Sequence, residues 1–124
     1  MLEQAIYSHL VATMGNNKVY PTVFPDNVAM PAILYQRITG TPSVTHSGDG
    51  AVEGAQFQIS CFAKTFANAV SLAEAVKAAF SAYSGPMGDL PDVRTLVVNE
   101  IALYEAEARL HHIVVDVDIL AKLS

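Results

Sequence analysis

The stretch HHIVVDVDIL (residues 111–120) decides how the rest of the chain is interpreted. Side chains along a β-strand point alternately to opposite faces. One face of this stretch carries His111 followed by four apolar residues, Ile113, Val115, Val117 and Ile119. The other face is mostly polar: His112, Val114, Asp116 and Asp118. This alternation predicts a strand that is buried on one side and polar on the other.

Two adjacent histidines and two nearby aspartates also raise the question of a metal or acid–base site. Only His112 shares a face with the aspartates, and it stands about 13 Å from Asp116 along an extended strand. Metal ligands must lie within about 2 to 2.6 Å of their ion, so this face cannot close around a metal unaided. Asp116 and Asp118, about 7 Å apart, would need further ligands. We expect no metal site here.

Other combinations of reactive residues are equally poor candidates for catalysis. His46, Ser47 and Asp49 lie together in a glycine-rich segment, which is a poor frame for a nucleophile and its base. Cys61 falls on the apolar face of a predicted strand and is interpreted as a buried core residue. We therefore expect no catalytic residues, no cofactor and no enzymatic activity.

Charge is distributed unevenly along the chain. Residues 89–118 carry seven acidic residues and two arginines, a balance of −5, while the remainder has five acidic and five basic residues. The acidic residues of this segment are Asp89, Asp92, Glu100, Glu105, Glu107, Asp116 and Asp118. Tight binding to nucleic acid requires clustered Lys and Arg. The sequence has no such cluster, so specific nucleic-acid binding is not expected.

Composition favours a small α+β domain. The chain has 124 residues, of which 52% are hydrophobic and only 15% charged, and a chain this apolar often covers part of its surface with a partner. Its N-terminus carries an early acidic residue and no basic segment, so a signal peptide is not expected. The sequence contains no uninterrupted apolar run of about 18 residues, so a membrane span is not expected. We expect one domain spanning residues 1–124.

Periodicity and breaker residues predict seven elements. Helices are expected over residues 2–14 and 66–83, the second with Thr65 as its N-cap. Strands are expected over residues 32–39, 55–63, 93–106 and 110–121, with at most a short edge strand over 19–24. Residues 40–54 are interpreted as a long glycine-rich loop, and residues 84–92 as an irregular connector. The expected order is α-β-β-β-α-β-β, and the last two strands are expected to form a long C-terminal hairpin.

The order of these segments resembles a known family. Residues 19–41 read VYPTVFPDNVAMPAILYQRITGT, in which Pro31 precedes a strand containing Ile33, Leu34 and Tyr35. A glycine-rich segment follows, then an alanine-rich helix of the form T-x-x-x-A-x-x-L-A-x-A-V that begins at Thr65. A late strand carries Val114 and Asp116. Together these features resemble the small tail-completion proteins of long-tailed phages, the head–tail joining or tail-terminator-like family.

The resemblance implies a compact α+β fold, in which two helices pack on a mainly antiparallel sheet of four to five strands. It also implies a structural role in the virion tail. It implies an oligomeric ring, expected to contain six copies, that caps the head-proximal end of the tail tube. The implied partners are further copies of this chain, the tail tube protein and the head connector or stopper protein, and DNA would pass through without specific binding. Assembly in the host cytoplasm is implied as well, and no membrane is involved.

Several residues are interface candidates on this interpretation. Arg37 stands among apolar residues of a strand and could pair with a carboxylate within the fold or across a subunit contact. The other candidates are His46, Asp49, Glu105, Glu107, Asp116 and Asp118. We expect acidic residues of 89–118 to line the lumen of the ring, where negative charge repels phosphate. We also expect the 40–54 segment to contact a neighbouring subunit or the tube.

A second function class remains open from the sequence. The chain could instead be a small cytoplasmic domain that binds a metabolite or a metal through the 111–118 face or the glycine-rich segment. That alternative predicts a thermal shift with a small ligand. The tail-completion interpretation instead predicts that the protein forms a ring on tails.

Overall fold

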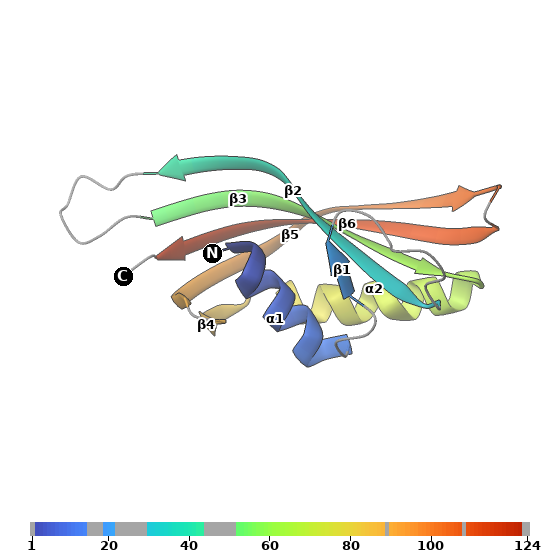
Figure 1. Cartoon of the computed structure of the whole chain (residues 1–124), viewed down its shortest axis with the longest axis horizontal. Coiled ribbons are helices and arrows are strands. Elements are labelled where there is room, and N and C mark those ends of the chain that lie inside the picture. The colour runs from blue at the N-terminus through green and yellow to red at the C-terminus, as the bar shows by residue number, and fades with distance from the viewer. Residues whose placement is uncertain are drawn as a thin grey trace.

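The computed structural model describes residues 2–14, 19–21, 30–43, 52–88, 90–107 and 109–122. Two helices and six strands follow one another along the chain (Figure 1). In chain order they are α1 (Leu2–Met14), β1 (Val19–Pro21), β2 (Ala32–Ser43), β3 (Val52–Ala63), α2 (Phe66–Phe80), β4 (Ser84–Met87), β5 (Leu90–Glu105) and β6 (Leu110–Lys122). The α+β class expected from the sequence is confirmed, and the expectation of one domain stays a prediction.

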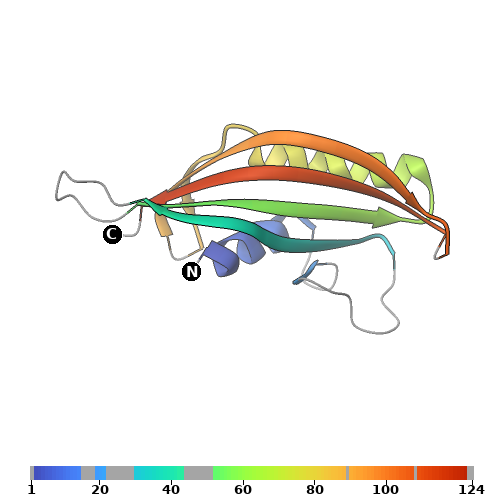
Figure 2. The same cartoon turned by 90° about the horizontal axis from the view of Figure 1, so that it is seen from above.

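All six strands form one sheet in the order β1-β2-β3-β6-β5-β4. β1 runs parallel to β2, and every other neighbouring pair is antiparallel, so the sheet is mixed. The four long strands are bowed along their length and twist strongly across one another (Figures 1 and 2). The predicted count of four to five strands is too low, whereas the long C-terminal hairpin of β5 and β6 is present, with Glu105 opposite Leu110.

Both helices lie on the same side of the sheet (Figure 1). The buried core between the layers takes Ile6 and Leu10 from α1 and alternate residues of the central strands, among them Phe57, Ile59 and Val115. α2 buries an alanine-rich stripe against the sheet: Ala69, Leu72, Ala73, Val76 and Phe80. Short alanine side chains allow the helix to lie close to the strands, and burial of these apolar groups stabilises the fold.

The boundaries of several elements correct the predictions from sequence. β2 continues to Ser43 and β3 begins at Val52, so both ends of the predicted 40–54 loop are strand, paired from Gly40↔Ala55 to Ser43↔Val52. Glycines lower strand propensity, but a register set by the apolar residues upstream carries the ladder through them. α2 ends at Phe80 instead of residue 83 because Ser81 and Ala82 leave the helical conformation, Ala82 with φ 51. β1 ends at Pro21, and residues 22–24 of the predicted 19–24 strand lie outside the described residues.

The predicted irregular connector 84–92 contains β4 and the first residues of β5. Pro86 is tolerated there because β4 is an edge strand, which does not need every N–H for pairing. Gly88 follows β4 with φ 58, and a Cβ at this position would stand 2.9 Å from the Cα of Ala5. A glycine is therefore required where the turn crosses α1.

Candidate functional site

The surface most open to partners is the sheet face opposite the helices, in the region of β3, β6 and β5. No described helix covers this face, which we call the open face (Figure 1). Cross-strand neighbours there are polar: Gln58 stands opposite Asp116, and Gln56 stands opposite Asp118. The alternation predicted for residues 111–120 is confirmed, since Ile113, Val115, Val117 and Ile119 are buried on the helical side. Val114 is an exception on the open face, because it is buried.

The two aspartates of the open face do not meet a histidine. Asp116 accepts a 3.4 Å hydrogen bond from Nδ2 of Asn99 on β5. Asp118 is exposed and stands opposite Leu96 of β5 on one side and Gln56 of β3 on the other. Within the described ranges, no three His, Cys, Asp or Glu side chains come together to hold a metal ion.

His112 pairs with a carboxylate across the hairpin instead of with the aspartates on its own strand. Its Nδ1 lies 3.4 Å from Oε1 of Glu105, and its ring stacks on Phe62 with centroids 4.0 Å apart. Burial lowers the pKa of His112, while the hydrogen bond and charge of Glu105 oppose that change. Nε2 is buried and has no hydrogen-bond partner among the described residues. The site therefore favours a neutral imidazole.

His111 points to the other side of the sheet, as the alternation predicts. Its ring lies 5.6 Å from Phe66 at the start of α2 and 4.9 Å from Tyr104 on β5, measured between ring centroids. Phe66 and Tyr104 are both more than half exposed. His111 thus belongs to a partly exposed aromatic cluster beside the β5–β6 turn, and the two adjacent histidines have separate environments.

Arg37 has a carboxylate partner within the chain. Its Nη1 lies 3.3 Å from Oε2 of Glu3 on α1, and this ion pair ties β2 to the first helix. The side chains of Arg37 and Glu3 are 28% and 50% exposed, so solvent screens the pair and its contribution to stability is small. Of the two readings open from the sequence, the structure shows a contact within the fold. A role at a subunit interface stays a prediction.

The remaining candidates are dispersed. Glu105 and Glu107 are exposed at the β5–β6 turn, whereas His46 and Asp49 lie outside the described residues. Cys61 is fully buried in the core, as expected, and burial followed by the nearby charge of Glu100 raises the pKa of its thiol to about 12. A protonated, buried thiol is a poor nucleophile. Glu100 belongs to the helical side, where its carboxylate lies 3.1 Å from Nζ of Lys77.

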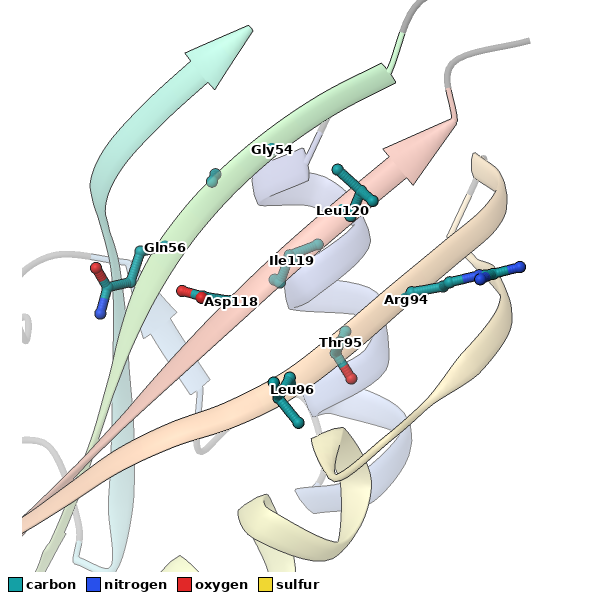
Figure 3. A pocket seen from close by; sticks show the side chains of 9 residues that line it. Gly54, Gln56, Arg94, Thr95, Leu96, Asp118, Ile119 and Leu120 are labelled. Carbon is teal, nitrogen blue, oxygen red and sulfur yellow. The ribbon is translucent and has the colours of Figure 1, made fainter. Parts of the chain in front are cut away.

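A shallow hollow of about 440 Å³ lies on the open face (Figure 3). It spans β3, β6 and β5, and Gly54 contributes to it a position without a side chain. Leu96 and Leu120 give it apolar walls, and Arg94 and Asp118 give it charges of both signs. In Figure 3, Asp118 points toward Gln56, while Arg94 extends from β5 in the opposite direction. The hollow offers a shape into which an apolar side chain of a partner could fit.

Exposed apolar side chains concentrate on one strand, and sequence reasoning missed this feature. Five of them lie on β5, each between 43% and 57% exposed: Leu96, Val98, Ile101, Leu103 and Tyr104. A signal was present, because LVVNEIALY (residues 96–104) is almost continuously apolar and does not alternate. Such a run is consistent with a strand covered on both faces. Leu96, Ile101 and Leu103 lie on the open face, which no described helix covers. Tyr104 lies on the other side, beside His111. Exposed apolar patches of this kind are typical of interaction surfaces.

The fold and surface define a class of protein: a small α+β domain with an open sheet face and exposed apolar side chains on β5. Neither described helix is long and apolar enough to cross a membrane. The model of the family described as "Tail completion protein gp17" matches residues 4–122. The chain therefore belongs to this family, and it is a structural protein of the virion tail.

The fold also matches a solved structure. A chain in the structure titled "Virion of native gene transfer agent (GTA) particle" superimposes with a TM-score of 0.64 at 21% sequence identity. The match covers 91% of this chain and 84% of that chain, so the two share a fold over most of their length. No curated protein matches the sequence.

Proposed function

We propose that copies of this protein form a ring on the head-proximal end of the phage tail tube. The ring ends growth of the tube and presents a docking surface to the head connector or stopper protein. The proposal rests on membership in the tail-completion family over residues 4–122, because a protein that completes a tail must act at a tail end. The proposed ring contains six copies. Its partners are the head connector or stopper protein on one side and the tail tube protein on the other.

The chemistry of the surface supports a role in assembly. Exposed apolar side chains on β5 and the hollow beside Leu96 and Leu120 favour contacts with other proteins. Asp116 and Asp118 lie on β6, which stands between β3 and β5, and both can repel phosphate. We propose that this face lines the lumen through which DNA passes. Glu100 is less suited to that role because it pairs with Lys77 on the helical side.

The test is to image, by negative-stain electron microscopy, the lysate of a phage or induced prophage that lacks this gene. Filled heads beside unattached tails, especially tails of abnormal length, are the expected result. Expression of the intact gene from a plasmid should restore joined particles. Normal particles in the absence of the gene would refute the proposed function.

A further inference from the structure

Two long strands of the sheet have edges that no described strand occupies. β1 pairs with β2 only at Ile33, Leu34 and Tyr35, so the described strands leave the outer edge of β2 free from Gln36 onward. β4 pairs with β5 no further than Arg94, and the N–H of Thr95 donates to the carbonyl of Tyr83, so the described part of the chain leaves the outer edge of β5 free from Leu96 to Glu105. Alternate N–H and C=O groups of such edges point outward and can pair with another strand.

Pro42 limits the length of the β2 edge that can pair with another strand. Pro42 has no N–H and cannot donate to an added strand, so the segment able to pair runs over residues 36–41. The β5 segment, residues 96–105, is long enough to match it at several registers. Each segment contains a bulge, between Arg37 and Thr39 on β2 and between Val97 and Asn99 on β5.

The direction of the strands makes the two edges complementary. β2 is antiparallel to β3, β3 to β6, and β6 to β5, so β5 runs opposite to β2. A second copy rotated about an axis along the strands keeps the direction of every strand. Its β2 would therefore meet β5 of the first copy in antiparallel sense, and the alternation of the sheet would continue across the junction.

The side chains favour the same pairing. The β5 segment exposes Leu96, Val98 and Ile101, and the β2 segment exposes Ile38. The charged residues of the β5 segment are both acidic, Glu100 and Glu105, whereas Arg37 is the charged residue of the β2 segment. Pairing β5 with another β5 would bring acidic residues of two copies together, whereas the β2 segment contains no acidic residue.

We propose that the free edge of β5 in one copy pairs with the free edge of β2 in the next copy, so that the sheets of neighbouring subunits are continuous. This head-to-tail contact uses a different surface on each side and can close into a ring. The inference rests on the proposed ring and adds its interface. The partner of the β5 edge is thus a second copy of this chain.

Cysteine cross-linking on assembled tails tests the interface. The variants Ile38→Cys, Val98→Cys and the double variant replace exposed bulge residues, so they should fold. A bis-maleimide with a spacer of about 10 Å tolerates a register offset of about three residues. A second pair, Gln36→Cys with Ile101→Cys, covers another register. The native Cys61 should stay unmodified because it is fully buried.

The double variants should give a ladder of dimers, trimers and larger products, whereas each single variant should give none. The control pairs Val98→Cys with Ser71→Cys on the exposed side of α2 and should give no ladder. A dimer from Val98→Cys alone would show a two-fold β5 contact and overturn the proposal. Absence of any ladder from normally joined particles would also overturn it, while leaving the proposed function intact. Failure of the gene deletion to affect joining would refute the function itself.

Discussion

His112 shows how the surroundings of one side chain create a dependence on pH. The ring is stacked on Phe62 and partly buried, which disfavours its charged form, and the carboxylate of Glu105 only partly offsets this cost. The pKa of His112 is lowered from its ordinary value of 6.5 in the folded protein. The unfolded chain therefore binds a proton at a higher pH than the folded protein does.

We expect stability to fall on acidification for this reason. The contribution of neutral His112 is fully present above pH 6.5 and is lost as the pH falls from that value through the lowered pKa of the folded state. His112→Phe should remove this part of the pH dependence. Glu105→Gln, which removes the interaction that raises the pKa, should extend the loss to lower pH. The free energy of unfolding, measured by urea titration above and below pH 6.5, tests both variants. If the unfolding free energy of His112→Phe depended on pH as strongly as that of the unmodified protein, His112 would not be the source of the effect.

The face on which each of these side chains lies was predictable, but its partner was not. Period two placed His111 and His112 on opposite faces. The contact between His112 and Glu105 depends on the register of the hairpin, in which Leu103 stands opposite His112 and Glu105 opposite Leu110. The turn between the strands sets that register, and the alternation of either strand does not reveal it.

α2 is positioned by its first turn as well as by its buried stripe. Oγ1 of Thr65 accepts a 3.2 Å hydrogen bond from the backbone N–H of Asn68, which satisfies one of the free donors at the helix start. β3 ends two residues before, at Ala63, so this cap lies where the chain passes from the sheet into α2.

Thr65→Ala should therefore destabilise the fold by about 1 kcal/mol, because the N–H of Asn68 loses its acceptor. Thr65→Ser keeps the hydroxyl and should retain most of the stability. The free energy of unfolding from urea titration is the measurement. Equal losses in the two variants would indicate that the methyl group of Thr65 matters more than the hydrogen bond.

Element types followed from periodicity and capping, while element ends depended on pairing. Thr65 and the alanine-rich pattern after it were sufficient to predict α2, and periodicity over residues 55–63 was sufficient to predict β3. The sequence SGPM gave no strand signal, and β4 forms because Ser84 and Gly85 find partners on β5. β2 and β3 extend beyond their predicted ends because an established ladder tolerates residues of low strand propensity.

The carboxylates of the molecule are distributed over both sides of the sheet. Asp116 and Asp118 lie on the open face, whereas Glu74 and Glu100 both contact Lys77 on the helical side. The sequence predicted an acidic C-terminal part without saying which face each carboxylate would take. Nor could it reveal the free edge of β5, because strand order in a sheet is a property of the whole chain.

Reversal of charge on the open face should slow the passage of DNA if that face lines the lumen. Asp118→Lys places a cation where phosphate would pass, and added salt should weaken the effect by screening. Glu74→Lys makes the same change in charge on α2 and is the matched control. The rate of DNA release from joined particles is the measurement. Equal rates in the two variants would refute a lumenal position for Asp118.

The pairing of β6 along nearly its whole length with both β3 and β5 has a mechanical consequence. Tension applied along these strands shears the ladders, so many hydrogen bonds share the force and must fail together. Tension applied across the sheet separates the strands one hydrogen bond at a time. The domain is therefore stiffest along its strands and weakest at right angles to them, and the direction in which it is held determines how much force it can withstand.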